Sequence, residues 1–191
     1  MMNLFRLAIA SVLCVPMLAV IPSIASAQTH RESLAIPLPD ARIEIYKAKR
    51  ELVLYSGDQI VRRYRIGLGF TPNGQKFKEG DGATPEGTYM ICVKNPKSRY
   101  YLSLGINYPN AHDAKRSFES GHITKSAFDK IIAAEVSGKC PPWDTPLGGE
   151  IYVHGHGSSS DWTLGCIALD NVHIKELFDA TSIGTTVTLF P

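Results

Sequence analysis

Residues 151–157 read Ile-Tyr-Val-His-Gly-His-Gly, and after three serines residues 161–167 read Asp-Trp-Thr-Leu-Gly-Cys-Ile. The apolar start of the first segment predicts a short strand that delivers His154 to a glycine turn. In the second segment glycine stands directly before Cys166, where an apolar run begins. Glycine beside both reactive side chains allows the backbone to approach a substrate closely. These two segments therefore predict a site carried by β-structure.

The pairing of His154 with Cys166 has a chemical interpretation. A cysteine nucleophile reacts as its thiolate, so it needs a base or a cation near the sulfur. His154 is the candidate base, and backbone N–H groups around Gly165 and Cys166 are candidates to hold an oxyanion. The alternative is an inert, buried Cys166 with an unrelated histidine nearby.

Other residues near these segments have both a structural and a functional interpretation. His156 is either a solvated loop histidine or a group that binds substrate or tunes Cys166. Asp161 and Trp162 can shape the mouth of the site, although Trp162 can equally serve local packing. We keep His156 and Asp161 as candidate substrate-binding residues. Four more residues can line a groove: Arg99, Tyr100, Tyr101 and Tyr108. Aromatic residues in a β domain are more often core, so none of the four is assigned.

The remainder of the chain predicts one mostly β domain. Apolar residues alternate over residues 41–69, with a turn at 56–58, which is typical of a strand meander. After Cys166, Asp170 or Asn171 can cap a short helix. The same reasoning predicts the other elements in order: a strand at 88–93, irregular backbone at 96–110, helical structure within 111–136, a loop at 140–149, a strand at 150–154 and a last strand at 185–190.

The N-terminal segment has the order of a secretory signal peptide. Arg6 supplies a positive charge, residues 7–21 form a nearly unbroken apolar run that Pro16 interrupts, and Ala25-Ser26-Ala27 forms a small-residue cleavage site. We therefore predict a signal peptide at 1–27, a polar leader at 28–40, a catalytic domain at 41–191, and export to the periplasm. The alternative is an apolar segment that stays attached as a membrane anchor.

Charge and cysteine content narrow the function classes. The formal net charge of +2 comes without a dense basic tract, so we expect no nucleic-acid partner. Cleavage at residue 27 removes Cys14 and leaves Cys92, Cys140 and Cys166. In an oxidising compartment two of three cysteines tend to pair, and the third is a candidate reactive thiol.

The quoted motifs resemble the L,D-transpeptidase catalytic domain family (YkuD type). That family carries His-Gly followed by Ser-x-Gly-Cys-[Ile/Val]-Arg, and residues 154–155 and 163–167 follow this pattern with threonine in place of the serine. Residues 52–69 resemble the family's strand meander, and residues 84–89 its Thr-Pro-x-Gly-x-aromatic turn. The resemblance covers most of residues 41–190, with 111–136 as an insertion.

This resemblance implies a fold and a set of roles. The fold is a mostly β, L,D-transpeptidase-type β-sandwich with a helical insertion and a short helix after the catalytic cysteine. By the resemblance Cys166 is the nucleophile, His154 is the base and the Gly155 carbonyl orients the imidazole. Gly165 and Thr163 then belong to the oxyanion and substrate-binding region. No metal or organic cofactor is implied.

The implied reaction opens the peptide bond after the diamino acid at position three of a peptidoglycan peptide stem. It forms a thioester on Cys166 and passes the acyl group to an amine or to water. The implied partners are diamino-acid-containing stems, and a wall-attached protein is considered as acceptor or substrate. With Cys166 as the nucleophile, Cys92 and Cys140 are the expected disulfide pair; alternatively both stay reduced or one pairs with Cys166.

Two departures from the family pattern leave the reaction open. Thr163 replaces the usual serine but keeps a hydroxyl. Ala168 replaces the usual arginine, which removes a cation able to bind a substrate carboxylate. The enzyme is therefore expected to be a transferase in wall cross-linking or remodelling, or alternatively an L,D-carboxypeptidase or amidase that hydrolyses stem-linked bonds.

Two rival classes follow from the same sequence. His-x-His is a metal-ligand spacing, and a zinc hydrolase could combine it with Cys166 and Asp161, although catalytic zinc needs three protein ligands. A non-catalytic wall-binding module is the second rival, because a family member can lose its chemistry and keep the groove. An intact His154 and Cys166 favour an enzyme over a binder.

Overall fold

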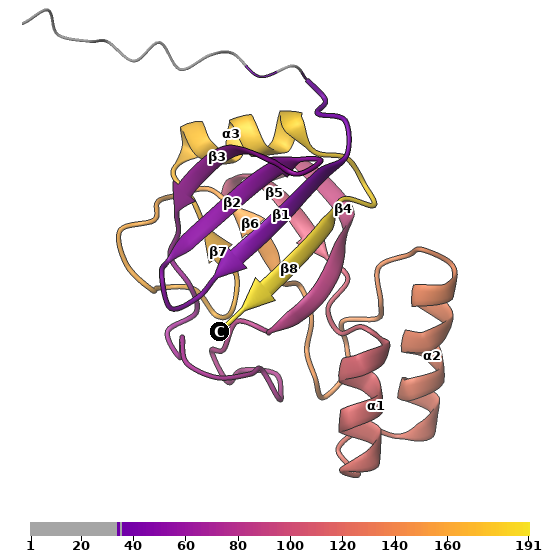
Figure 1. Ribbon diagram of the computed structural model, residues 1–191. Coiled ribbons are helices and arrows are strands. Elements are labelled where there is room, and N and C mark those ends of the chain that lie inside the picture. The colour runs from indigo at the N-terminus through magenta and orange to yellow at the C-terminus, as the bar shows by residue number, and fades with distance from the viewer. Residues whose placement is uncertain (1–33, 35) are drawn as a thin grey trace, which may run out of the picture. The chain divides into compact units, whose positions relative to one another are not determined.

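The computed structural model describes residue 34 and residues 36–191, so the predicted signal peptide lies outside the described residues (Figure 1). The described part of the chain contains eight strands and three helices. In chain order these are β1 (Ala41–Tyr46), β2 (Glu51–Ser56), β3 (Gln59–Arg65), β4 (Gly87–Ser98), β5 (Tyr101–Ile106), α1 (Ala111–Glu119), α2 (Lys125–Val136), β6 (Tyr152–His154), β7 (Ile167–Ala168), α3 (Asn171–Ala180) and β8 (Thr186–Phe190).

The strands form one curled sheet with the order β3-β2-β1-β8-β4-β5-β6-β7. Strand β4 belongs to both halves, because residues 87–90 pair with β8 while residues 91–98 pair with β5. The two ends of the sheet also come together: Gly67, just after β3, and Ala168 of β7 exchange backbone hydrogen bonds of 2.9 and 2.8 Å. The curl therefore brings the segment after β3 against β7, beside the motif that contains Cys166.

Strand alternation explains the core. Ile43 and Ile45 of β1 and Val187 and Leu189 of β8 point inward and are buried. Burying each such side chain stabilises the fold by about 1.5–3 kcal/mol. Helix α3 packs against β5 and β6 and lies across one end of the sheet (Figure 1).

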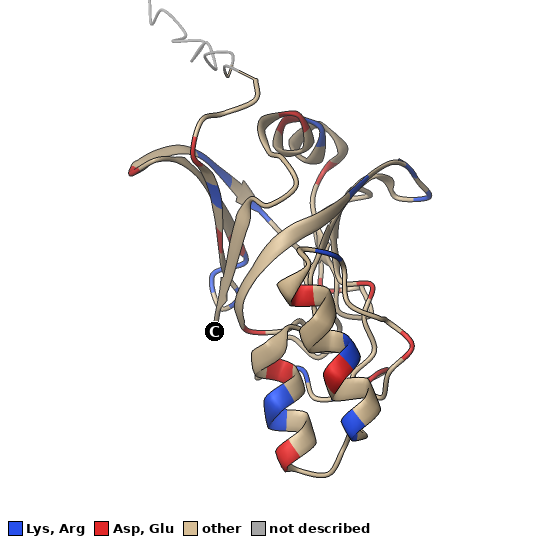
Figure 2. Cartoon of the chain, turned by 90° about the vertical axis from the view of Figure 1, so that its right-hand side faces the viewer, with Lys and Arg blue, Asp and Glu red and all other residues tan. Residues whose placement is uncertain are grey.

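Helices α1 and α2 form a hairpin at the other end of the sheet, beside the start of β4 (Figure 1). Asn110 and Asp113 form a reciprocal capping box at the start of α1, and the Thr124 side chain caps α2. Acidic and basic residues are interspersed along both helices (Figure 2). A small second core holds the hairpin: Ala114, Ile123, Ile131 and Leu147.

Two findings refine the elements expected from sequence. The prediction of irregular backbone over residues 96–110 is wrong, because β4 continues to Ser98 and β5 follows from Tyr101. The β4–β5 register shifts between Asn95 and Ser98, so Pro96 lies where the ladder is already irregular and its missing N–H costs little. Part of the predicted leader also contacts the domain, since Leu34 and Leu38 pack against the core.

The described residues contain no helix long and apolar enough to span a membrane.

Candidate active site

Cys166 and His154 line one cavity of about 540 Å³. Its walls come from four parts of the chain: the end of β4 with its turn into β5, the loop after Lys76, the segment from Trp143 to His154, and the motif from Trp162 to Cys166. The cavity is thus built around the two motifs with which the sequence analysis began.

Pairing of β6 with β7 explains why the two reactive side chains lie on one face of the sheet and line the same cavity. The strands are parallel, with Val153 opposite Ile167 and His154 opposite Ala168. Extending that register by one residue places Cys166 opposite Tyr152. Because side chains alternate along a strand, Cys166 lies on the same face of the sheet as Tyr152 and His154. The Tyr152 N–H indeed donates to Cys166 Sγ at 3.4 Å, and Sγ donates to the Glu150 carbonyl at 3.4 Å.

The imidazole of His154 is held in one orientation. Its Nδ1 lies 2.7 Å from the Gly155 carbonyl oxygen, which can only accept a hydrogen bond, so Nδ1 carries the proton. Nε2 is therefore free to accept one. The Tyr100 ring stacks on the imidazole with centroids 4.5 Å apart, and Trp162 contacts it edge-on at 5.6 Å. The side chain is 2% exposed, so it has little freedom to turn away.

The two reactive groups are both uncharged at neutral pH. Burial raises the pKa of Cys166 to about 11, although the Tyr152 N–H acts in the opposite direction. Burial lowers the pKa of His154, partly opposed by its hydrogen bond to Gly155. The resting pair is consequently a thiol and a neutral imidazole, which suits proton transfer during the attack rather than a thiolate–imidazolium pair formed beforehand.

Two glycines of the motif have no room for a side chain. A Cβ on Gly155 would lie 2.5 Å from Asn171 Oδ1 and 2.7 Å from the Tyr100 carbonyl. Gly165 has φ +130°, and a Cβ there would lie 2.7 Å from the Ala83 carbonyl. The backbone beside both reactive residues is therefore packed tightly against neighbouring chain.

Thr163 fixes the turn before the cysteine. Its hydroxyl donates to the Cys166 carbonyl at 2.7 Å and accepts from the Gly165 N–H at 3.2 Å. The hydroxyl group, which serine would also supply at this position, thus bonds to the backbone of its own turn. Because the Gly165 N–H is already engaged, the Cys166 N–H becomes the better candidate for an oxyanion contact.

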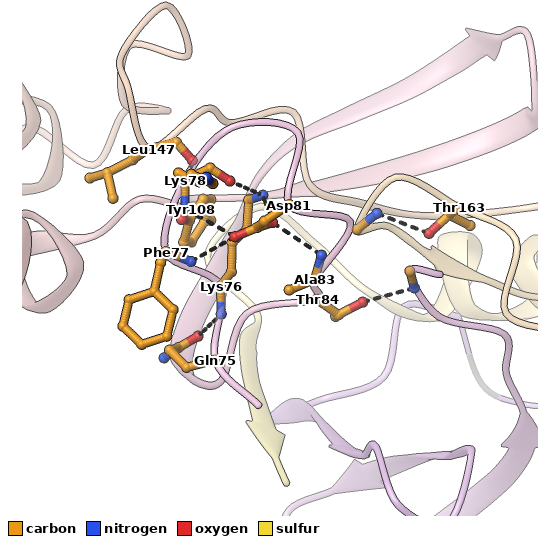
Figure 3. A network of polar contacts seen from close by, with 12 residues as sticks. Gln75, Lys76, Phe77, Lys78, Asp81, Ala83, Thr84, Tyr108, Leu147 and Thr163 are labelled. Atoms are coloured by element: carbon orange, nitrogen blue, oxygen red, sulfur yellow. Dashed lines mark hydrogen bonds and ion pairs between the residues drawn. The ribbon is translucent and has the colours of Figure 1, made fainter. Parts of the chain in front are cut away.

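A loop at residues 75–84 contributes Lys76, Glu79 and Gly80 to the cavity lining, and Figure 3 shows its polar contacts. The Asp81 carboxylate accepts from Lys76 Nζ at 2.8 Å and from the N–H groups of Phe77, Lys78 and Ala83. Burial acts to raise the pKa of Asp81, but the bonds from Lys76 and the backbone outweigh it and lower the pKa. The ion pair keeps Lys76 buried on the cavity wall, where its charge slightly favours the Cys166 thiolate.

Two predicted substrate-binding residues do not line the cavity. The Asp161 carboxylate is bound by the Arg50 guanidinium, with contacts of 2.7 to 3.0 Å, and by the Leu68 N–H. It ties the motif to the β1–β2 turn. His156 has φ +78° and an exposed side chain, and its N–H donates to Asn171 Oδ1. Within the described chain both residues shape the loop, and their contact with substrate stays a prediction.

Tyr100 was left unassigned in the sequence analysis, which did not foresee that its ring stacks on His154.

Cys92 and Cys140 form a disulfide with Cα atoms 5.2 Å apart, and Cys166 is free. The bridge links β4 to the segment after α2, so it holds the helical hairpin to the sheet. In the described part of the chain no three side chains of His, Cys, Asp or Glu gather as metal ligands.

The site thus consists of an oriented histidine at the end of β6 and a cysteine directly before β7 of a curled sheet, and sequence comparison identifies the class of domain that carries it. The chain belongs to the YkuD family, the L,D-transpeptidase catalytic domain, which matches residues 40–189. The family and the mostly β fold predicted from the sequence are confirmed.

Known proteins of similar sequence or fold are longer than this chain. An Escherichia coli K12 protein described as "Putative L,D-transpeptidase YafK" is 28% identical over 142 residues, which are 71% of this chain and 45% of the relative. The chain therefore spans less than half the length of that curated relative.

Two solved structures share the fold. Bd1075 of Bdellovibrio bacteriovorus aligns with a TM-score of 0.52 and 23% identity, over 80% of this chain and 48% of its own. The helical cell shape determining protein Pgp2 of Campylobacter jejuni, solved as a K307A mutant, aligns with a TM-score of 0.51 and 26% identity, over 81% of this chain and 48% of its own.

Proposed function

We propose that this protein is an exported cysteine acyltransferase that acts on the peptide stems of peptidoglycan. The observation that carries the proposal is a free thiol and a fixed, neutral imidazole on one wall of a cavity, within a YkuD catalytic domain. Export to the periplasm is supported by the charge, apolar run and small residues of the first 27 positions.

The first half of the reaction forms a thioester. Nε2 of His154 accepts the thiol proton while Cys166 Sγ attacks the carbonyl carbon of the bond after the diamino acid. The Cys166 N–H stabilises the oxyanion that forms. The imidazolium then gives its proton to the leaving amine as the carbon–nitrogen bond breaks. His154 is thus neutral again when the acyl-enzyme has formed.

The second half releases the acyl group. An incoming amine or water gives its proton to His154 and attacks the thioester, and the departing sulfur takes the proton back. Amine attack gives transpeptidation, which serves cross-linking or remodelling of the wall. Water gives an L,D-carboxypeptidase or an amidase. The acceptor amine can belong to a second stem or to a wall-attached protein.

Product analysis tests this proposal. Wild type and Cys166→Ala are incubated with a stem tetrapeptide and a competing amine, and the products are weighed by mass spectrometry. The proposal expects loss of the terminal residue in wild type alone, with amine captured for transfer or water for hydrolysis. Equal product with both proteins would reject Cys166 as the nucleophile.

The rival classes have their own outcomes in this assay. A wall-binding module would bind the stem without turnover by either protein. A zinc hydrolase would lose turnover on chelation and would contain stoichiometric metal after purification. Turnover that survives chelation and requires Cys166 separates the acyltransferase from both rivals.

A further inference from the structure

Two basic side chains on the cavity wall have no ion-pair or hydrogen-bond partner among the described residues. Lys97 and Arg99 lie at the end of β4 and in its turn into β5, and both are exposed. Among residues 34 and 36–191 neither side chain forms a salt bridge or a hydrogen bond. Arg99 contacts only an aromatic ring, with its guanidinium 5.1 Å from the Tyr100 centroid. The charges of both residues therefore remain available to a ligand.

Neighbouring lysines show how cations with a structural task are held in this fold. Lys76, on the same cavity, is neutralised by Asp81 at 2.8 Å. Lys94, on the same strand, donates its Nζ to the carbonyls of Phe178 and Thr181 at 2.5 and 2.6 Å. Lys97 and Arg99 differ from both, because no carboxylate or carbonyl oxygen of the described chain binds their charge.

The position of Arg99 relates it to the reacting groups. Tyr100 stacks on His154, and Arg99 lies over the same Tyr100 ring. The guanidinium is thus one aromatic ring away from the imidazole. On the Cys166 side of the cavity the wall carries Glu150, whose carbonyl accepts from the thiol. A carboxylate entering the cavity is attracted toward the His154 side and repelled from the Cys166 side.

Ala168 stands where the family usually has an arginine, so this position does not supply a cation for a substrate carboxylate. Ala168 is fully buried, and its backbone pairs with Gly67 where the sheet closes. An arginine side chain at this position would have to fit where the structure has room for one buried methyl group. Arginine elsewhere on the cavity can do the same work, because its planar fork binds a carboxylate through two parallel hydrogen bonds.

We propose that Arg99, assisted by Lys97, binds a carboxylate of the peptide stem and so sets which stems the enzyme accepts. This inference rests on the proposed function. Two carboxylates fit: that of the terminal residue, which leaves, and that on the side chain of a diamino acid such as diaminopimelate. Both present the same chemistry to a guanidinium, and amidation of one at a time distinguishes them.

Binding to an inactive protein tests the inference without requiring turnover. Calorimetry in the Cys166→Ala background measures the Kd of a tetrapeptide with diaminopimelate at position three and of its two singly amidated forms. We expect Arg99→Gln to weaken binding of the unmodified peptide roughly 10- to 100-fold. The Cys166→Ala protein that keeps Arg99 should bind one of the two amidated peptides as weakly as the Arg99→Gln variant binds the unmodified peptide. In the Arg99→Gln variant that amidated peptide and the unmodified peptide should have the same Kd. Lys97→Gln should show a smaller change in the same direction.

The matched control is Lys49→Gln. Lys49 is also exposed and also lies over a tyrosine ring, 4.9 Å from the Tyr46 centroid, but it is not on this cavity. Its substitution should leave all three Kd values unchanged. The inference is overturned if the parent does not bind the peptide, or if Arg99→Gln weakens carboxylate and amide forms equally or not at all. Arg99-dependent binding without wild-type turnover would reject only the proposed chemistry.

Discussion

Two of the four parts of the cavity wall differ in how firmly their side chains are held. On the β6–β7 wall, His154 is buried between a carbonyl, a stacked tyrosine and an indole, and the backbone beside it has no spare space. On the β4–β5 wall, Lys97 and Arg99 are exposed and unpaired within the described chain. The fold therefore fixes the groups that carry out chemistry and leaves the groups that meet a ligand's charge free to adjust.

The largest effect should come from the nucleophile on the rigid wall. Cys166→Ala should lower turnover by more than about 10³-fold, since no other group can form the thioester. Stability should change little, because the substitution removes one small side chain whose two hydrogen bonds are both long, at 3.4 Å. Stem turnover and thermal unfolding check this, and a variant that turns over normally would contradict the mechanism.

Crowding the rigid wall should give the next largest effect. Gly155→Ala places a methyl group 2.5 Å from Asn171 Oδ1, so the end of β6 must shift. We expect about 10²-fold lower turnover and a loss of about 1–3 kcal/mol in the free energy of unfolding. Turnover and denaturant unfolding are measured.

Gly57→Ala is the control for this change. Gly57 has φ +55° with nothing within 4 Å of an added Cβ, so it carries a backbone cost but no clash. It should be somewhat destabilised and fully active. Equal activity of the two variants would mean that the space beside His154 does not matter.

The pH dependence should show that the resting pair is uncharged. Burial lowers the pKa of His154, so kcat/KM should stay constant as pH falls through 6.5 and then drop about tenfold per unit below that lowered pKa. Below pH 6.5 His154 takes up a proton more readily in the unfolded protein than in the folded one. The free energy of unfolding should therefore decrease as pH falls from 6.5 towards the lowered pKa.

The thiol itself gives an independent readout of the same state. Because burial raises the pKa of Cys166 to about 11, alkylation by iodoacetamide in the absence of stem should be slow at pH 7. The alkylation rate should keep rising with pH until the pH reaches the pKa of the thiol. Rapid alkylation that levels off near pH 6 would instead reveal a preformed thiolate–imidazolium pair.

The smallest effect should come from the residue that joins the two walls. Tyr100→Leu removes the ring stacked on His154 and should lower kcat about three- to tenfold, with little change in KM. Tyr100→Phe keeps the ring and should restore activity. Because burial by that ring helps to lower the pKa of His154, the acidic limb of the pH profile should move to higher pH in Tyr100→Leu alone. An unmoved limb would leave Tyr100 with a structural role only.

How much the sequence predicted depended on how local each feature is. Cys166 and His154 stand in short glycine-framed motifs, and the disulfide pair followed once Cys166 was set aside, so all three could be proposed from the sequence. Tyr100 reaches His154 only because β5 pairs with β6, with Ser103 opposite His154. That register is a tertiary property with no local signal.

Polar partners were equally difficult to foresee. Asp161 stands beside the motif and suggested substrate contact, but Arg50 from the β1–β2 turn binds it. The Lys76–Asp81 pair belongs to a charged loop that gave no sign of lying on the cavity wall. Ion pairs between distant segments depend on how the closed sheet packs, and the sequence alone does not show that packing.

Locating an acyl group on the protein would test the central claim most directly. Wild type mixed briefly with stem tetrapeptide is quenched in acid, and the intact mass and peptide map are recorded beside Cys166→Ala. The account predicts an adduct equal to the stem without its terminal residue, placed on the peptide that contains Cys166 and absent from the variant. An adduct on another residue, or stem turnover by Cys166→Ala, would contradict it.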